Sequence, residues 1–545
     1  MRVTRLRSDN NLWMVLFLGC LCCSCMQEEA RCPEDYLGPE ARRTALEGRD
    51  ATSAPVSGSA NPQAAIRNSQ SDRGPLQVTI EEATLLALEN NESLVVQRIE
   101  PQIARTFVQE AWAVFDPILA AELAYERNKI GEGPVESDVE GVSAAVGVQE
   151  FLPTGTSLGL TGSTAPNTLV GPVEEDEYAT RIGFNATQSL LRGFGPAVNL
   201  ASVDQAKIDV RISQYELRGF AQALVAQVEE TYWDYVLAER RIGIFNQSLE
   251  LAQKQLEETR ERIRLGDLAP TELSAAEAEV ALRREALINA RSTLAKTKLT
   301  LLRLVNPPGA NLWDRQIVPA SPPTSPAVTL DEVESHVALA LQMRPDLNQA
   351  KLAWQRGELE VVKTRNGLLP RLDLFVVLGH SGFADSFGGS LRNLDSDNYE
   401  ALVGLDFEYP LWNRGARARH LRAVLTRQQA REAVRNLAQL VEVDVRIAYL
   451  EIVRAQEQVT ATAATRKLQE EKLRAETEKF RLGKSTSLLV GQAQRDYVSS
   501  QIDEIQAVIS YLKSFVEMYR LEGSLLERRG IAGPGREPVQ LSDAS

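Results

Sequence analysis

Cysteine is scarce in this chain of 545 residues, and four of its five cysteines lie between positions 20 and 25. Only Cys32 follows them, so the rest of the chain cannot form an internal disulfide. Histidine is just as scarce: His336, His380 and His420 are scattered along the sequence and predict no metal site. No constellation of nucleophile, base and acid is apparent either. We therefore expect no cofactor and no enzymatic activity.

Long apolar runs and basic stripes are also missing. After residue 25, no segment has the ~18 uncharged apolar residues that a membrane-spanning helix needs. A chain without such a helix can cross a bilayer only as a β-barrel, because open strand edges stay unsatisfied in lipid. The net charge of −14 argues against binding to nucleic acid, whose phosphates need basic partners.

The N-terminus has the features of an export signal. Three arginines within residues 2–7 precede an apolar stretch, 12–21, that is too short to span a bilayer stably. Cys25 then follows a serine, as in the lipidation site of bacterial lipoproteins, and Cys20 after a glycine is the alternative. A plain secretory signal with incidental cysteines is the remaining interpretation.

The chain repeats its own pattern at constant offsets, which is what a duplicated structural unit leaves in a sequence. One offset of 253 positions and another of 217 positions recur. The matched pairs are Leu94 with Leu347, Pro117 with Pro370, Tyr232 with Tyr449, and Leu265 with Leu482. We expect two copies of one structural unit.

Four segments alternate between apolar and polar residues with a period of two. This pattern is typical of barrel strands that face lipid outside and water inside, although a half-buried sheet of a soluble protein gives the same alternation. In the barrel interpretation Arg181, Asp406 and Glu408 line the lumen. The first copy has an extra hairpin-like segment at 142–162, which the sequence places neither inside nor outside the barrel. The apolar positions are Leu119, Ala121, Leu123 and Tyr125; Tyr178, Thr180, Ile182 and Phe184; Leu372, Leu374, Val376 and Leu378; and Val403, Leu405, Phe407 and Tyr409.

Proline is absent after each group of strands, from 197 to 269 and from 411 to 533. Apolar residues recur there every three or four positions, which predicts coiled-coil helices of about 100 Å. Each helix is expected to stop at a glycine, Gly266 or Gly483, and a shorter helix to return beside it.

These patterns divide the chain into six parts. The expected ranges are 1–25 for the signal peptide; 26–75 for an irregular tether; 76–306 for repeat 1, with strands in 116–188, a long helix at 197–264 and a return helix at 271–305; 307–326 for an irregular connector; 327–525 for repeat 2, with strands in 371–411, a long helix at 416–482 and a return helix at 486–522; and 526–545 for a polar tail.

Taken together, these motifs resemble the TolC-type outer-membrane efflux protein family over residues 76 to 525. The resemblance rests on the paired Thr-(Ile/Leu)-(Glu/Asp)-Glu openings at 79 and 329, the strand entries at Pro117 and Pro370, and the Leu-Gly hairpins. It implies a mixed fold: a homotrimeric outer-membrane β-barrel continued by a long α-helical coiled-coil periplasmic barrel, with an internal two-fold repeat. It also implies three partners, namely outer-membrane lipid, a periplasmic adaptor protein and an inner-membrane pump.

The resemblance assigns roles to the hairpin tips, which in this family contact the adaptor and form a constriction. Gly266, Glu272 and Gly483 match positions at the family's tips, whereas Leu489 and Gln492 stand where some members place inward acidic residues. A ring of Leu489 side chains would make a hydrophobic constriction, with Glu272 and Gln492 as the other candidates; Leu489 packed in the coil is the alternative. The expected adaptor-contacting residues are Gly266, Asp267, Glu272, Gly483, Lys484 and Ser485.

The function we expect is passive conduction by a lipid-anchored outer-membrane channel of a tripartite export system, with drugs, toxic solutes or ions as cargo. A channel for a secreted polypeptide and a pore-free periplasmic scaffold are the alternatives.

Overall fold

The structure is a computed structural model that describes residues 76–130, 137–168, 176–308, 312–324, 330–395 and 397–540. Apart from Gly530–Ala532, these residues belong to one compact unit. The predicted signal peptide and tether, with Cys20 and Cys25, lie outside the described residues.

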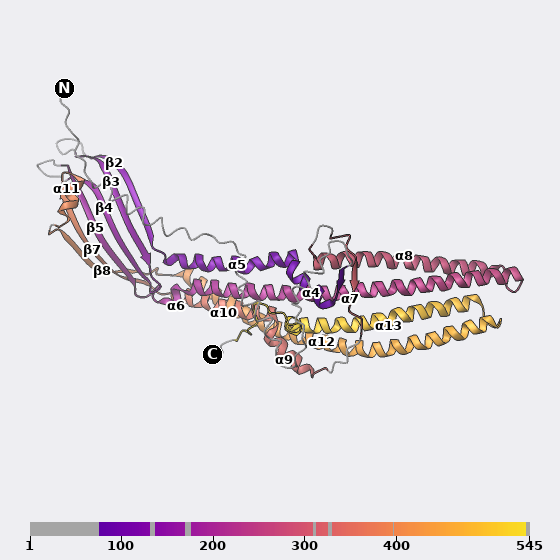
Figure 1. Ribbon diagram of the computed structural model, residues 1–545. Coiled ribbons are helices and arrows are strands. Elements are labelled where there is room, and N and C mark those ends of the chain that lie inside the picture. Colours follow the sequence, from indigo (N-terminus) through magenta and orange to yellow (C-terminus); the bar gives the residue numbers. More distant parts are fainter. Residues whose placement is uncertain are drawn as a thin grey trace, which may run out of the picture. The chain divides into compact units, whose positions relative to one another are not determined.

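Helices and strands follow one another in the same order in both halves of the chain (Figure 1). Two helices lead into strands, and a very long helix and its shorter return helix follow. The helices of the first half are α4 (Ile80–Asn90), α5 (Glu92–Trp112), η3 (Ala113–Phe115), α6 (Pro196–Asn199), α7 (Ala201–Leu265) and α8 (Thr271–Val305). Those of the second half are α9 (Val333–Met343), α10 (Pro345–Asn366), α11 (Phe387–Arg392), η4 (Asn393–Asp395), α12 (Arg414–Arg481), α13 (Ser487–Glu522) and α14 (Leu525–Arg528).

The first helix begins with a capping box, which explains one of the repeated motifs. The Thr79 hydroxyl accepts a hydrogen bond from the Glu82 amide, and the Glu82 carboxylate accepts one from the Thr79 amide. The corresponding acidic motif in the second half works differently, because α9 starts later, at Val333, after Glu332. The two similar motifs therefore begin the first helix of each half with different local geometry.

Six strands form one antiparallel sheet in the order β2-β3-β4-β5-β7-β8. The hairpin that the sequence left unassigned, 142–162, lies within β3 and β4, which are inserted between β2 and β5 in this sheet. The two halves meet where β5 pairs with β7. The strands are β2 (Ile118–Ile130), β3 (Ser137–Phe151), β4 (Thr156–Thr168), β5 (Asp176–Ser189), β7 (Arg371–Ala384) and β8 (Tyr399–Glu408).

The two longest helices, α7 and α12, form the axis of the helical part, and their bounds lie within a few residues of the expected 197–264 and 416–482. Each spans about 100 Å at 1.5 Å per residue. Shorter helices line them in two successive stretches: α5 and then α8 run along α7, and α10 and then α13 run along α12 (Figure 1). Each long helix thus keeps a neighbour over most of its length.

The hydrophobic core lies where the short helices meet the long ones. In the first half, Val228 and Tyr232 of α7 pack against Leu301 and Leu302 of α8. In the second half, the corresponding cluster joins α9, α12 and α13, with Val445, Ile452 and Met518 fully buried. These contacts bury the apolar stripes whose period predicted the helices.

The connector between the halves is more ordered than the irregular segment expected at 307–326. Its residues Ile317–Pro319 form β6, which pairs in parallel with β1 (Leu76–Val78). The Tyr232 hydroxyl donates to the Val78 carbonyl (3.1 Å) and accepts from the Ser321 amide (3.0 Å), so one buried phenol holds both segments. A three-residue strand that pairs with a distant segment leaves no periodic signal in the sequence.

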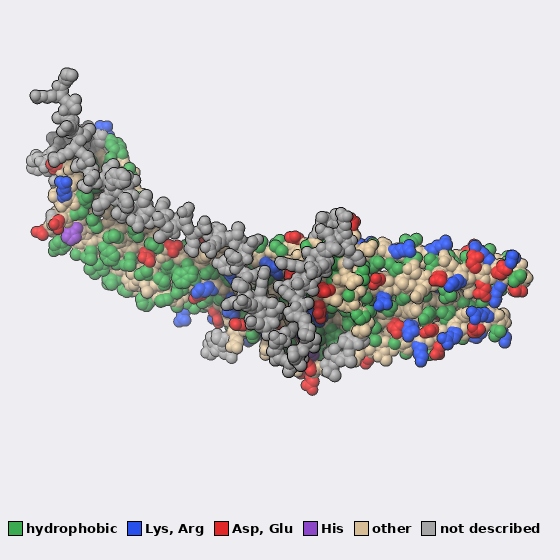
Figure 2. Space-filling view, in the orientation of Figure 1, with side chains coloured by type: hydrophobic (Ala, Val, Ile, Leu, Met, Phe, Trp, Pro, Cys, Tyr) green, Lys and Arg blue, Asp and Glu red, His purple; other side chains and the backbone are tan. Residues whose placement is uncertain are grey.

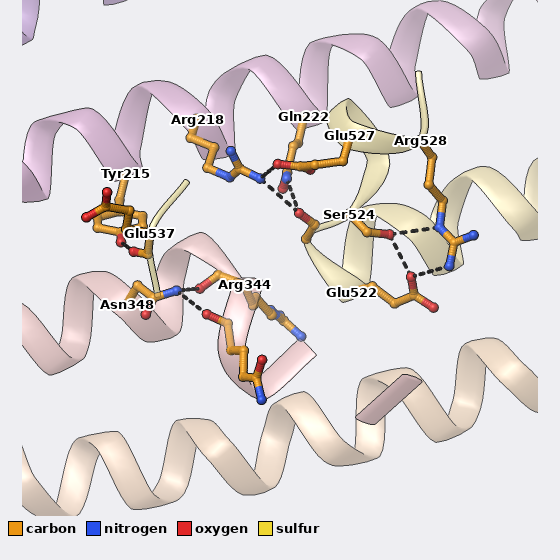
Figure 3. A network of polar contacts seen from close by, with 12 residues as sticks. Tyr215, Arg218, Gln222, Arg344, Asn348, Glu522, Ser524, Glu527, Arg528 and Glu537 are labelled. Carbon is orange, nitrogen blue, oxygen red and sulfur yellow. Dashed lines mark hydrogen bonds and ion pairs between the residues drawn. The ribbon is translucent and has the colours of Figure 1, made fainter. Parts of the chain in front are cut away.

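The residues after 525, expected as a polar tail with little structure, form α14 and then pack on the helices as far as Gln540 (Figure 3). The Tyr215 hydroxyl donates to the Glu537 carbonyl, and the Val539 amide donates to the Asn348 side chain (3.0 Å). Val539 is buried against Tyr215 and Leu352. Side chains of α7 and α10 thus satisfy the backbone of this segment, which its own sequence does not reveal.

A buried arginine, Arg218 of α7, ties the end of α13 to that helix (Figure 3). It pairs with Glu527 of α14 and donates to the Gly523 carbonyl, which also accepts from Gln222 (2.7 Å). Gly523 ends α13 with φ of 75°, a conformation that favours glycine. The arginine side chain is only 1% exposed, so its charge depends on these partners.

Replacing Arg218 with methionine should lower the free energy of unfolding by up to about 3 kcal/mol, because the Glu527 carboxylate loses its partner, while the Gly523 carbonyl keeps its hydrogen bond from Gln222. Urea-induced loss of the helical circular dichroism signal in detergent measures this. Arg240→Met, on an exposed position of the same helix, should change stability by less than about 0.5 kcal/mol. Equal effects of the two substitutions would contradict the assigned role of Arg218.

Candidate functional site

One face of the six-stranded sheet is apolar and exposed on every strand. The register places the apolar residues in rows across the strands, as in Leu123↔Ala144 and Val376↔Val403. Figure 2 shows hydrophobic side chains concentrated over the strands, whereas charged side chains cover the far end of the helices. The exposed members of this face are Leu119, Leu123, Tyr125, Val142, Val146, Val148, Leu160, Ile182, Phe184, Leu378, Val403, Leu405 and Phe407.

The opposite face of the sheet is polar and holds two groups of ion pairs. Arg181 of β5 pairs with Glu400 of β8. Arg371 of β7 pairs with Asp406 and Glu408 of β8, and its Nε lies 3.0 Å from the Asp373 carboxylate. The three residues predicted for a lumen, Arg181, Asp406 and Glu408, therefore share this face.

Sequence reasoning missed the partners of these three residues. Glu400 lies on the same face of β8 as Asp406 and Glu408, and Arg371 and Asp373 lie directly opposite Glu408 and Asp406 on β7. Following the alternation through both whole strands would have identified them. Each predicted charge has an opposite charge beside it, but Arg371 alone serves three carboxylates, so this face keeps an excess of negative charge at these positions.

The tip of the α7–α8 hairpin turns at Gly266, which has φ of 84° and open space where a side chain would begin. The Asp267 amide donates to the Arg262 carbonyl (2.8 Å), which closes the last helical turn. The α12–α13 tip turns at Gly483, with φ of 69°. There the Lys484 amide donates to the Lys479 carbonyl (2.8 Å), and the Ser485 hydroxyl donates to Glu476 (2.9 Å). Hydrogen bonding to Lys479 and Ser485 lowers the pKa of the Glu476 carboxyl.

Two polar links join the hairpins, one in the first turn after the tips and one about two turns further on. The Ser487 hydroxyl of α13 donates to the Glu272 carboxylate of α8. One turn or two further on, Arg495 of α13 lies 2.6 Å from Glu279 of α8, which also pairs with Arg283. These links connect residues about 215 positions apart in sequence, so no local pattern predicts them.

The three candidate constriction residues are not together in this structure. Glu272 is engaged by Ser487 in the contact between the hairpins. Leu489 and Gln492 lie one turn apart on an exposed face of α13, and Leu489 is 46% exposed. In the single chain, then, Leu489 is not packed in the coil.

The other polar sites in the described residues do not resemble an active centre. His336 is buried and pairs with Glu522, and His420 lies 3.2 Å from the Thr364 hydroxyl. Within the described ranges, no group of three or more His, Cys, Asp or Glu side chains could hold a metal ion. In the same part of the chain, no helix combines the length and the hydrophobicity needed to cross a membrane.

A sheet with one exposed apolar face, joined to helical hairpins of about 100 Å, defines a membrane protein with a long coiled-coil extension. A family model described as "Outer membrane efflux protein" matches residues 85–306 and 337–524, which is most of the chain. The protein belongs to this family, as the resemblance to TolC-type proteins predicted, and is a protein of the outer membrane.

Two curated relatives agree with this assignment. Outer membrane efflux protein BepC of Brucella suis biovar 1 (strain 1330) is 24% identical over 344 residues, which are 62% of this chain and 71% of BepC. Pyoverdine export outer membrane protein OpmQ of Pseudomonas putida is 25% identical over 339 residues, which are 59% of this chain and 65% of OpmQ.

Among solved structures, the outer-membrane channel OprN superposes with a TM-score of 0.62. The match covers 82% of this chain and 90% of OprN at 16% identity, so it shows a shared fold. These relatives are outer-membrane channel proteins and not enzymes.

Substituting alanine for Gly266 should destabilise the α7–α8 tip by about 1–2 kcal/mol, because a left-handed residue with a side chain is strained. The amides of the turn should then exchange with deuterium about tenfold faster or more. Gly243→Ala, at a helical position of α7 with open space around it, should instead stabilise the helix by up to about 1 kcal/mol. Unchanged exchange at the tip would mean that the turn tolerates a side chain.

Proposed function

We propose that this protein is the outer-membrane channel of a tripartite export system, passively conducting small molecules from an inner-membrane pump and a periplasmic adaptor to the exterior. The observation that carries the proposal is the two-faced sheet, which is apolar on one side and ion-paired on the other. No step of the proposed transport requires chemistry in this chain. The energy comes from the pump.

The two edge strands of the sheet support a homotrimeric barrel. β2 and β8 are the edges of the six-stranded sheet in one chain, so each has backbone groups without a strand partner there. In lipid such edges are too costly to leave open. Pairing β8 of one copy with β2 of the next, three times, closes an 18-stranded barrel. Its apolar face meets lipid, and Arg181, Asp406 and Glu408 line the water-filled lumen.

The helical hairpins supply the periplasmic part in this proposal. Continued below the barrel, α7 and α12 with their shorter neighbours form a coiled-coil tunnel about 100 Å long. Because the same order of elements occurs twice, each chain contributes two similar helical hairpins to the wall of the tunnel. An N-terminal lipid at Cys25, or at Cys20, would add an anchor in the same membrane.

A small-molecule cargo is favoured by the relatives. One is described as an efflux protein and the other as a pyoverdine export protein. The ion-paired polar face suits a lumen that passes hydrophilic or amphipathic solutes, and its excess of carboxylates favours cations. Drugs, toxic solutes and ions are all compatible with such a surface.

The hairpin tips are the proposed gate and the adaptor contact. Gly266, Asp267, Gly483, Lys484 and Ser485 form the exposed turns that an adaptor would meet. The links from Ser487 to Glu272 and from Arg495 to Glu279 hold the hairpins together and favour the closed state. Leu489 and Gln492, exposed on the stretch of α13 between these two links, are placed to narrow the pore where three copies converge.

In a planar bilayer, the purified protein should form pores, and Leu489→Ala should raise their conductance or the fraction of time they are open. A smaller side chain widens a hydrophobic constriction and makes it easier to wet. Leu468→Ala, at an exposed position of α12 away from the tip, should leave both quantities unchanged. Pores that are indifferent to Leu489→Ala would remove this residue from the gate, and a folded trimer without pores would favour a scaffold.

Arg495→Gln should increase the open fraction by about fivefold, because a partly buried charged hydrogen bond between the hairpins is worth at least about 1 kcal/mol. Single-channel recording with the same bilayer measures it. Arg481→Gln is the matched control, since Arg481 pairs with Glu478 within its own helix near the same tip. If Arg481→Gln raises the open fraction equally, the Arg495–Glu279 ion pair does not hold the pore closed.

A further inference from the structure

An open cavity of about 540 Å³ lies where the strands of the sheet give way to the helices. Three chain junctions border it: the turn after β5 with Arg192, the end of α10 at Gly367, and the β8–α12 junction from Pro410 to Arg419. All three junctions lie at the same end of the sheet, next to the helical part (Figure 1).

The lining of the cavity combines basic and apolar residues. Its charged lining residues are Arg192, Arg414 and Arg419, and no carboxylate lines it. Leu411 and Trp412 form its apolar wall and are 81% and 70% exposed. A large indole and a leucine this exposed, beside three guanidinium groups, make a surface that is amphipathic over a few ångströms.

The first part of α12, residues 414–431, contains six arginines and no acidic residue. Further along α12, several arginines pair with carboxylates, as in Arg435–Glu432, Arg454–Glu451 and Arg481–Glu478. In the described residues, Arg414 and Arg419 have no such partner, and neither has Arg192 from the turn after β5. The first turn of α12 contains no acidic residue, so Arg414 stands where a helix disfavours positive charge. The positive charge at the start of α12 is thus unfavourable for the helix itself and favourable for binding an external anion.

The position of the cavity indicates the source of that anion. The apolar sheet face reaches Phe407, one residue before β8 ends, and the exposed Leu411 and Trp412 continue the apolar surface into the cavity. Tryptophan and arginine at the end of an apolar band are typical of the membrane–water interface, where lipid headgroups lie. Guanidinium groups bind phosphate oxygens in a bidentate manner.

We propose that this cavity binds the phosphodiester headgroup of an anionic phospholipid from the leaflet on the helical side of the membrane. Arg414, Arg419 and Arg192 hold the phosphate, and Leu411 and Trp412 pack against the start of the acyl chains. The bound lipid supplies the negative charge that the junction lacks and fixes how deeply the sheet sits in the membrane. This inference rests on the membrane insertion of the sheet given under the proposed function.

The test uses the full-length protein purified in a neutral detergent, with short-chain phosphatidylglycerol as the probe. Its melting temperature should rise with added phosphatidylglycerol and not with phosphatidylcholine of the same chain length, since ligands that bind the native state stabilise it. In Arg414→Gln/Arg419→Gln the apparent affinity should fall by roughly 30-fold, or about fivefold for each basic residue removed. Arg414→Lys/Arg419→Lys should restore most of the binding because it keeps the charge.

The matched control is Arg431→Gln/Arg474→Gln, which removes two exposed arginines of the same helix away from the cavity. It should leave the affinity unchanged. An equal loss in this control, an equal response to phosphatidylcholine, or full stabilisation by inorganic phosphate alone would each overturn the lipid site. The lipid site would also be overturned if Arg414→Gln/Arg419→Gln broke up the oligomer but left the response to phosphatidylglycerol intact. The cavity would then be a contact between copies.

Failure of this inference can be told apart from failure of the proposed function. Lipid binding is measured in detergent and needs no pore, whereas conduction is measured on the wild-type protein in a planar bilayer. Pores without selective lipid binding would overturn the lipid site alone. Selective binding without pores would keep the site and overturn the channel.

Discussion

The structure depends on burying one apolar stripe along each of two helices that are too long to be stable alone. α7 and α12 are 65 and 68 residues long, and most of their surface is polar. A helix of this kind gains its stability from packing, not from intrinsic propensity. Apart from α7 and α12 themselves, no helix in the described residues is long enough to cover either stripe, so the cover comes in two pieces, a short helix on the strand side and a return helix on the tip side. The breaks between these pieces are where the core clusters and the buried Arg218 lie.

Because each long helix is covered by two shorter ones, the middle of the helical part carries many long-range polar contacts. Each junction between a short helix and a return helix leaves helix ends whose backbone groups need partners. Tyr232 serves β1 and the connector, and Arg218 with Gln222 serves the carbonyl of Gly523 at the end of α13. The segment after α14 completes the same region through Tyr215 and Asn348. Toward the tips, by contrast, the contacts between the hairpins include two polar links and the Arg262 guanidinium of α7, which lies over the ring of the buried Phe480 of α12.

The two ends of the molecule therefore face different physical demands. At the sheet, alternation separates an apolar exposed face from a polar face whose charged residues form ion pairs. At the tips, ion pairs on the helix surfaces and two links between hairpins dominate. The junction between sheet and helices is where α12 begins with arginines and no acidic residue, and it is there that an external anion has the most to stabilise.

Sequence alone determined those features that follow from local periodicity. The period of two predicted the strand faces and the shared side of Arg181, Asp406 and Glu408. The absence of proline and the period near 3.6 predicted α7 and α12 to within a few residues, and glycine predicted the turns at Gly266 and Gly483. Tertiary structure decided what depends on contacts between distant segments. Examples are the insertion of β3 and β4 into one sheet, the pairing of β6 with β1, the docking of the segment around Val539, and the engagement of Glu272 by Ser487. Periodicity records which side of an element is buried, but it does not record which distant partner buries it.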